Sequence, residues 1–326
     1  MNAFVIGNGG WGTALGMVLA ENGHAVTIWG PFEEEIETIR AASENSVYLP
    51  GVELPEGIDW TSNETEVENA DLVVLVTPSR FYRSTLEKFA PHLRDDTLIV
   101  SATKGLDEKT HQRMSEVAAD VLNRDIAILS GPSHAEEVAR GVPTAVAIAG
   151  INFQTLEKIQ TAFTGKTFRV YTSTDVIGVE LGGTLKNIIA VAAGILDGIG
   201  LGDNSKAALM TRGLAEITRL GTALGAQPET FSGLSGIGDL IVTCASRHSR
   251  NRSVGERLGK GETLQEIMDG MKQVAEGVWN AKAAHDLAKE YGIDMPITEE
   301  VCAIVEEGKD PRQALKDLMS RDPRAE

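Results

Sequence analysis

The sequence predicts an α/β protein in which a doubly wound sheet is followed by an all-helical C-terminal domain. Three observations predict this fold. A glycine-rich turn directly follows the first apolar run of the chain. Short strand-like runs then alternate with helix-period segments, and after about residue 174 long helical segments follow with almost no strand pattern. The 326 residues suit two domains, which we expect at 1–174 and 175–326.

The first thirty residues read as a strand–helix–strand unit. Residues 3–6 form an apolar run, and residues 11–21 have helical spacing after the glycine-rich turn. Gly23 is expected to end this helix as its C-terminal cap, and residues 25–29 form the next strand. The two strands of such a unit are parallel and joined by a right-handed crossover. The unit therefore predicts a Rossmann-like N-terminal domain.

The rest of the first domain continues this alternation. Further strands are expected at 72–77, 98–103, 126–131, 144–149 and 168–172. Helical spacing at 81–89 and 111–122 separates several of them. Glu33–Glu35 are expected to begin the helix after the second strand, because a helix N-terminus favours negative charge.

The second domain is predicted from helical spacing alone. Its helices are expected at 175–197, 204–224, 227–234, 250–258, 263–270, 274–291, 297–307 and 311–319. The glycine-containing stretch SGLSGIGDLIVTCAS, residues 232–246, is expected to add a helical turn or two.

Charge and cysteine content exclude several classes of function. The net charge of −17 argues against non-specific binding to nucleic acid or to an anionic membrane. An anionic small-molecule ligand then needs a locally basic pocket. Cys244 and Cys302 lie far apart, so we expect neither a disulfide framework nor a metal site, and Cys244 is expected to be a small buried residue. With no targeting signal and no uninterrupted membrane-length apolar run, we expect a cytoplasmic protein.

The turn after the first strand has the spacing of a dinucleotide-binding loop. Gly7, Gly9 and Gly12 form GxGxxG between a strand and a helix. Gly7 allows the tight turn, Gly9 admits the pyrophosphate, and Gly12 permits close packing of helix and strand. The N–H groups of Gly10, Trp11 and Gly12 are expected to face the phosphates. The alternative is a glycine-rich turn that binds nothing, which this context disfavours.

The end of the second strand leaves the choice between NAD and NADP open. NAD sites usually carry an acid there, and NADP sites an arginine nearby. This strand ends at Trp29 and continues Gly30, Pro31 and Phe32, so neither marker stands at the tip.

Ligands of open α/β sheets bind beyond the carboxyl ends of the strands. Lys104 follows one such end, and Gly131, Ser133 and Ala135 follow another. Ser133 could cap a following helix, and Lys104 could instead be a solvated loop lysine. His134 lies beside Ser133 but has no readable acid partner, so a hydrolase triad is not expected.

One lysine interrupts the most apolar helical stretch, residues 181–199. Lys186 stands there among Ile, Ala, Val and Leu, and a lone ammonium in a core is unfavourable without a partner. Gly182 and Gly183 precede it and predict close approach by another backbone or a ligand, because each weakens the helix. Taken alone, the pattern favours a lysine that extends its amine to solvent.

Eight short motifs together resemble one family. They are GNGGWGTAL at 7–15, YLPG at 48–51, TKGL at 103–106, GGTLKN at 182–187, GIGDLIVTC at 236–244, SRNR at 249–252, VAEG at 274–277 and MPITEEV at 295–301. The chain resembles the NAD(P)-dependent sn-glycerol-3-phosphate dehydrogenases of the soluble bacterial and eukaryotic type. The similarity covers nearly the whole chain, and several motifs together are far more specific than any one.

The resemblance implies a reaction and a proton donor. The reaction is reversible hydride transfer between NAD(P)H and dihydroxyacetone phosphate, which gives sn-glycerol 3-phosphate for phospholipid synthesis. Lys186 would be the general acid/base, because a lysine desolvated in a cleft has a lowered pKa and exchanges its proton near neutral pH. The resemblance thus reverses the preference for a solvent-directed lysine.

The resemblance also implies the remaining site residues. Those expected to bind substrate are Lys104, Gly131, Ser133, Asn187, Asp239, Thr243, Ser249, Arg250 and Asn251. Those expected to bind NAD or NADP are Gly7, Gly9, Gly10, Trp11, Gly12, Phe32, Lys104, Ala135, Arg250, Val274 and Glu276. Asp239 could pair with a lysine and position it, although alone it would suggest a helix cap. Relatives are commonly dimers, so a homodimer is expected.

The segment 247–259 is expected to hold the substrate phosphate. Ser249 is a good N-cap, and the free N–H groups of the following helix suit an anion. Arg250 adds a planar fork for phosphate oxygens. With the arginines at 247, 252 and 257 it forms a small basic island in an acidic chain, although Arg247 and Arg257 could simply be solvated.

Two other readings fit parts of the sequence. Ketopantoate reductases and 3-hydroxyacyl-CoA dehydrogenases have the same loop and a helical second domain, but they need other substrate residues than GGTLKN and SRNR. A dinucleotide-sensing protein would bind the cofactor without turnover, and Lys186 would then be incidental.

Overall fold

The computed structural model describes residues 1–271 and 275–322. Their contacts divide the chain into two compact units. The first contains Met1–Asp107 and Gln112–Glu180, and the second contains Glu108–His111 and the chain from Leu181 onward. The division falls inside one long helix, α7 (Val176–Ile199). The boundary expected after residue 174 lies slightly earlier and stays a prediction.

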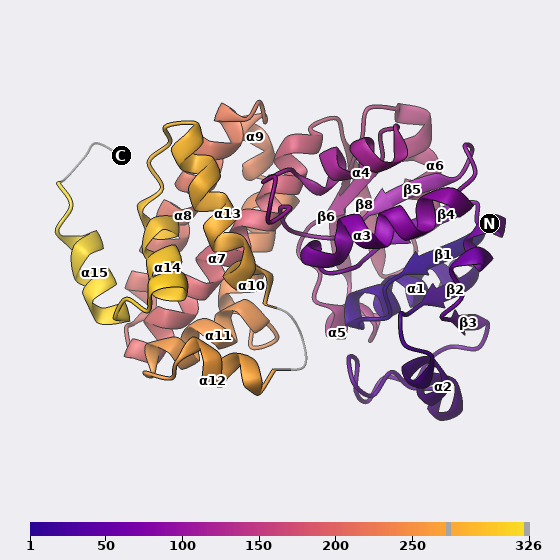
Figure 1. Ribbon diagram of the computed structural model, residues 1–326, viewed down its shortest axis with the longest axis horizontal. Coiled ribbons are helices and arrows are strands. Elements are labelled where there is room, and N and C mark those ends of the chain that lie inside the picture. Colours follow the sequence, from indigo (N-terminus) through magenta and orange to yellow (C-terminus); the bar gives the residue numbers. More distant parts are fainter. Residues whose placement is uncertain (272–274, 323–326) are drawn as a thin grey trace. The chain divides into compact units, whose positions relative to one another are not determined.

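The first unit is built on one eight-stranded sheet (Figure 1). Its strands are β1 (Asn2–Ile6), β2 (Ala25–Trp29), β3 (Ile58–Thr61), β4 (Leu72–Leu75), β5 (Leu98–Ser101), β6 (Ala127–Ser130), β7 (Thr144–Ala149) and β8 (Phe168–Ser173). They lie in the order β3-β2-β1-β4-β5-β6-β7-β8. The first six are mutually parallel, while β7 runs antiparallel to β6 and pairs in parallel with β8. The order reverses between β1 and β4, as in doubly wound nucleotide-binding sheets, which confirms the predicted fold class.

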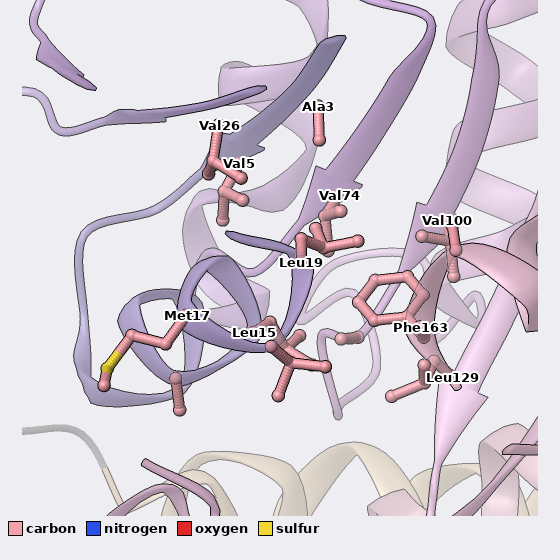
Figure 2. Close-up of a cluster of buried hydrophobic side chains, with 14 of the residues drawn as sticks. Ala3, Val5, Leu15, Met17, Leu19, Val26, Val74, Val100, Leu129 and Phe163 are labelled. Atoms are coloured by element: carbon pink, nitrogen blue, oxygen red, sulfur yellow. The ribbon is translucent and has the colours of Figure 1, made fainter. Parts of the chain in front are cut away.

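Helices bury both faces of this sheet. They are α1 (Gly10–Glu21), α2 (Glu33–Ala42), α3 (Ser79–Phe89), α4 (Met114–Leu122), α5 (Ala135–Val138) and α6 (Phe153–Phe163), with 3-10 turns η1 (Glu64–Asn69) and η2 (Ala90–His92). Val5 of β1 packs with Leu15 and Phe163 in one apolar cluster, which Figure 2 shows. Its neighbour Phe4 packs with Phe89 of α3 in the other. This alternation explains why the strands read as continuous apolar runs.

Several expected elements of the first unit differ from the structure. Strand β3 was not predicted, because IDWT is short and carries an acid, and helix α6 was not predicted either. The helix expected from residue 111 begins at Met114. The preceding residues form a hairpin instead, in which Leu106 bridges Arg113 and the N–H of Asp107 bonds the carbonyl of Gln112. Gly23 has φ +83° and follows the end of α1, as expected of its cap.

The tip of this hairpin, residues 108–111, belongs to the second unit. Within that unit, Nε2 of His111 lies 4.0 Å from Oδ2 of Asp286. The hairpin begins shortly after β5, the strand that Lys104 follows, so the chain leaves the first unit and returns to it within a few residues.

The second unit contains helices and no strand among its described residues. After α7 come α8 (Asp203–Ala223), α9 (Pro228–Phe231), a π-helical turn η3 (Leu234–Gly238), α10 (Asp239–Ala245), α11 (Arg250–Gly259), α12 (Leu264–Asp269), α13 (Glu276–Glu290), α14 (Pro296–Glu307) and α15 (Pro311–Met319). The predicted helices are confirmed to within a few residues, except that the one expected at 227–234 divides into α9 and the π-helical turn.

Neighbouring backbones approach α7 closely at its glycines. A Cβ on Gly182 would collide with the carbonyl oxygen of Ser235, which confirms the expected close approach there. A Cβ on Gly194 or Gly198 would collide with backbone oxygens of α11, and one on Gly255 of α11 would collide with α7. Small residues on both helices thus set the distance between their axes. By length and composition α7 could cross a membrane, but 89% of its apolar window is buried inside the protein, as in a core helix.

A buried glutamate holds the start of α14. Glu216 of α8 is 2% exposed. Its carboxylate accepts hydrogen bonds from the N–H groups of Ile297, at 2.7 Å, and Thr298, at 3.1 Å, and from the Thr298 hydroxyl at 3.1 Å. These are N–H groups that a helix start leaves without partners. Burial outweighs these bonds and raises the pKa of Glu216 to about 7.

This pKa predicts a pH-dependent stability. The native pKa of about 7 exceeds the ordinary 4.5, so between these values the folded state keeps a proton that the unfolded state has lost. The contribution of Glu216 to the free energy of unfolding therefore falls as pH rises from about 4.5 to about 7. We expect the wild-type value minus that of Glu216→Gln to fall by about 3 kcal/mol over this range in urea unfolding.

The matched control is Glu299→Gln, which removes an exposed carboxylate from the first turn of α14. This variant leaves the buried carboxylate in place, so its difference from the wild type should not show this fall. If the curve of Glu216→Gln also runs parallel to that of the wild type, the prediction is wrong.

Candidate functional site

The turn between β1 and α1 is shaped by three glycines with different surroundings. Gly7 has φ +127°, and a Cβ there would lie 2.6 Å from the Val76 carbonyl oxygen. A Cβ on Gly12 would collide with the carbonyl oxygen of Gly7. Gly9, by contrast, has no other atom within 4 Å of the place where its Cβ would lie. The first two glycines are required by the turn itself, and the third keeps space open above it.

This turn fits the pyrophosphate of a dinucleotide. Gly9 is the N-cap of α1 and makes no side-chain cap hydrogen bond, and no acidic residue lies in the first helical turn. The leading N–H groups, those of Gly10, Trp11 and Gly12, therefore stand at a helix end whose own first turn carries no carboxylate. A Cβ on Gly10 would lie 3.7 Å from the Cβ of Ala135. Ala135, a predicted cofactor contact, therefore lies beside the same turn.

Three predicted substrate residues meet at the carboxyl ends of β5 and β6. Nζ of Lys104 donates to the carbonyl oxygen of Gly131 at 3.2 Å. The Ser133 hydroxyl donates to the same oxygen at 3.0 Å. Ser133 is therefore not the helix cap that was expected: α5 has His134 at its N-cap, and no side chain bonds that helix end. Lys104 is half-buried, not a solvated loop lysine.

In the second unit, Lys186 lies in the middle of α7 with its amine buried. The residue is 6% exposed, and Nζ lies 2.6 Å from Oδ1 of Asp239 and 2.6 Å from the Thr243 hydroxyl. The amine is not carried to solvent, so the expectation from the helix alone is wrong. Asp239 pairs with this lysine, as the resemblance suggested. Burial raises the pKa of the neighbouring Cys244 thiol to about 12, which keeps it neutral and confirms its reading as a small buried residue.

A π-helical turn places the partners of Lys186. Residues 234–238 precede α10, and Gly236 inside them has non-helical torsion angles of −99° and −105°. Asp239 is the first residue of α10, and Thr243 follows one turn later on the same face. The Thr243 hydroxyl donates to the Asp239 carbonyl at 2.7 Å, so it is free to accept from the amine. The close contact of this turn with Gly182 fixes it against α7.

Two predicted asparagines form a buried chain of hydrogen bonds. Nδ2 of Asn251 donates to Oδ1 of Asn187 at 2.9 Å. Oδ1 of Asn251 accepts from the N–H of Gly277 at 2.8 Å. These hydrogen bonds join α7, α11 and α13. Glu276, the first residue of α13, is half-buried and accepts from Nδ2 of Asn280 at 3.0 Å. Val274 lies outside the described residues.

The start of α11 keeps only part of the expected basic island. Ser249 is its N-cap, and its hydroxyl accepts from the N–H of Arg252 at 3.2 Å, which confirms the predicted cap. Arg250, the first helical residue, is exposed. Arg252 and Arg257 are paired with carboxylates instead. Arg252 contacts Asp197 at 2.6 Å, and Arg257 contacts Glu262. The local positive charge is therefore smaller than the four arginines suggested.

The sequence reasoning missed two residues beside the glycine-rich turn. Asn8 stands between the first two glycines, is 6% exposed, and donates from Nδ2 to Oε2 of Glu35 at 3.1 Å. Glu35 was expected only as part of a helix start. Asn8 occupies a variable position of GxGxxG, so the motif itself gave no signal for its contact with Glu35. Phe32, which was predicted, is the N-cap of α2 and is 61% exposed.

Comparisons with known proteins identify the family of both halves of the chain. A family model described as NAD-dependent glycerol-3-phosphate dehydrogenase N-terminus matches residues 2–156, and the C-terminus model of the same family matches residues 175–316. The chain is 49% identical to a glycerol-3-phosphate dehydrogenase [NAD(P)+] of Agathobacter rectalis, over 99% of this chain and 96% of that protein. It is 50% identical to one of Geobacillus kaustophilus, over 100% of this chain and 96% of that protein.

A solved structure adds the same result for the fold. The crystal structure of glycerol-3-phosphate dehydrogenase from Coxiella burnetii superimposes with a TM-score of 0.95 at 39% sequence identity. The match covers 98% of this chain and 99% of that one. With family models matching both halves and relatives aligned along the whole length, the chain belongs to the family of NAD-dependent glycerol-3-phosphate dehydrogenases.

Proposed function

We propose that this chain catalyses reversible hydride transfer between NAD(P)H and dihydroxyacetone phosphate, with sn-glycerol 3-phosphate as the product. One observation carries the proposal: a buried lysine amine lies 2.6 Å from both a carboxylate and a hydroxyl. Curated relatives about half identical along the whole chain are named glycerol-3-phosphate dehydrogenase [NAD(P)+], which supports the same reaction.

The first unit would hold the dinucleotide. The N–H groups of Gly10, Trp11 and Gly12 would bind its pyrophosphate at the start of α1, where Gly9 leaves room for it. Phe32 and Ala135 are proposed to lie along the same cofactor, and Val274 and Glu276 stay predicted contacts for it. When bound, the nicotinamide supplies or accepts the hydride.

Lys186 would move the proton. As the carbonyl carbon of the substrate gains hydride, its oxygen becomes an alkoxide and takes a proton from Nζ of Lys186. The Asp239 carboxylate stabilises the ammonium form that the donor needs, and the Thr243 hydroxyl fixes the direction of the amine. In the reverse reaction the neutral amine accepts the hydroxyl proton. Because all three groups are buried, little reorientation is needed when charge develops.

The start of α11 would bind the substrate phosphate. Arg250 offers a planar donor fork, and the first N–H groups of the helix offer further donors. Lys104, oriented through Gly131 with Ser133, would add a cation toward the substrate. Asn187 and Asn251 are bonded to each other, so we assign them mainly to positioning α11 relative to Lys186.

We also propose a cellular setting. A soluble dehydrogenase of this kind is proposed to act in the cytoplasm, where its product would enter phospholipid synthesis. The homodimer stays a prediction.

The overall reaction is tested by oxidation of NADH and NADPH with dihydroxyacetone phosphate, beside ketopantoate and acetoacetyl-CoA. We expect turnover with dihydroxyacetone phosphate alone. Turnover of either other substrate instead would favour the rival reductases. Cofactor binding without turnover of any of them would favour a sensing protein, and either result would refute the proposal.

Replacing the proposed proton donor tests the mechanism. Lys186→Met keeps the length of the side chain but cannot transfer a proton, so kcat should fall by roughly 100-fold or more. Cofactor affinity should change little. The control is Lys282→Met, which removes an exposed lysine of α13 and should leave kcat unchanged. A near-normal kcat in a Lys186→Met protein that still binds the cofactor would mean that the proton comes from another group.

Replacing the proposed phosphate contact tests the substrate site. Arg250→Ala should raise KM for dihydroxyacetone phosphate by roughly tenfold or more, because a charge-assisted fork is lost. With dihydroxyacetone, which has no phosphate, the variant and the wild type should have similar kcat/KM. Arg247→Ala, an exposed arginine before the helix, is the matched control. An unchanged phosphate-dependent KM in Arg250→Ala would contradict the assignment.

A further inference from the structure

The segment after β2 concentrates negative charge where a dinucleotide site reads the adenosine ribose. β2 ends at Trp29, and α2 begins with Glu33, Glu34 and Glu35 in its first turn. In doubly wound nucleotide-binding sheets, the ribose of the adenosine lies at the end of this strand when the pyrophosphate lies at the start of the first helix. These three carboxylates therefore begin at the place where NAD and NADP differ.

Contacts join this segment to the glycine-rich turn. Nδ2 of Asn8, inside that turn, donates to Oε2 of Glu35 at 3.1 Å. A Cβ on Gly30 would lie 2.6 Å from Cγ of Asn8, so the backbone after β2 touches the same asparagine. Burial and the charge of Glu35 together raise the pKa of Tyr48, whose carbonyl lies against Gly10. Glu35 is thus half-buried beside the proposed cofactor site and is not a remote surface acid.

The first basic side chain after β2 in the sequence already has hydrogen-bond and ion-pair partners. Arg40 is the first lysine or arginine after β2 in the sequence. It donates to the carbonyl of Trp60 and lies 3.6 Å from a carboxylate oxygen of Glu33. Glu33 in turn accepts from the hydroxyl of Ser62, which follows β3. Phe32, the exposed N-cap, follows the end of β2, near which NADP sites usually carry an arginine, and it offers a ring face but no charge.

We infer that this segment makes the chain selective for NADH over NADPH. Glu35 is the main discriminating residue, and position 32 carries a phenylalanine and no cation that could bind a 2′-phosphate. A carboxylate accepts a hydrogen bond from the ribose 2′-hydroxyl of NAD. A 2′-phosphate carries between one and two negative charges near neutral pH and would be repelled by the three glutamates. The inference rests on the proposed function only in that both require a dinucleotide at the glycine-rich turn.

Direct binding tests it. NADH and NADPH are titrated into the full chain, and the dissociation constant of each is obtained from the change in nicotinamide fluorescence. The wild type should bind NADH at least roughly tenfold more tightly, the scale expected for charge repulsion at a few ångströms near a protein surface. Equal binding, or tighter binding of NADPH, would overturn the inference.

Two variants and one control locate the discrimination. Glu35→Gln keeps an acceptor for Asn8 but removes the charge, so the preference for NADH should shrink severalfold. Phe32→Arg supplies a cation, so the binding of NADPH should tighten by roughly tenfold. Glu37→Gln removes an exposed charge from the next turn of α2 and should leave the ratio unchanged. If Glu35→Gln and Phe32→Arg both keep the wild-type ratio, this segment does not discriminate.

The two proposals fail separately. If dihydroxyacetone phosphate is not reduced with either cofactor while NADH binds more tightly, the proposed reaction is wrong and the selectivity stands. If turnover is found but NADPH binds as well as NADH, the reaction stands and the selectivity is wrong.

Discussion

The close approach of neighbouring backbones to α7 is the constraint on which the second unit depends. A side chain at Gly182 would displace the π-helical turn that presents Asp239 to Lys186. Side chains at Gly194 or Gly198 would push away α11, the helix that begins with the proposed phosphate contacts. One helix therefore carries the proposed proton donor and also sets the position of its partners. Steric contact between these backbones therefore fixes the geometry around the amine independently of its charge interactions.

In the first unit, the glycines of the turn after β1 have a different role. Gly7 and Gly12 are required by the turn, whereas Gly9 leaves open space beside it. In the second unit, two basic side chains have carboxylate partners. The amine of Lys186 is matched by a buried carboxylate, and Arg252 is matched by Asp197. Both cations are therefore balanced by neighbouring acids of the same unit.

Sequence patterns predicted what depends on local spacing. The glycine-rich turn and the helices of the second half were found because their periodicity is long or their residues are adjacent. Strand β3 was missed because four residues with one acid carry no apolar run, and the parallel pairing with β2 that makes it a strand is not local. The pairing of Arg252 joins residues 55 apart, and the non-helical Gly236 that aims Asp239 has no local sign. Ser133 was misassigned because a hydroxyl before a helix can bond either the helix end or a carbonyl behind it, and here it bonds Gly131.

The hairpin after β5 limits how this chain can be divided. Because residues 108–111 belong to the second unit, the polypeptide passes between the units at three places and not one. A fragment that starts at Leu181 would lack His111 and therefore the contact that His111 makes with α13. A fragment that ends before α7 would keep the hairpin but would lack the unit to which the hairpin tip belongs. The two units are therefore poor candidates for exchange as modules, and a chimaera between relatives would have to move the hairpin tip together with the helical part.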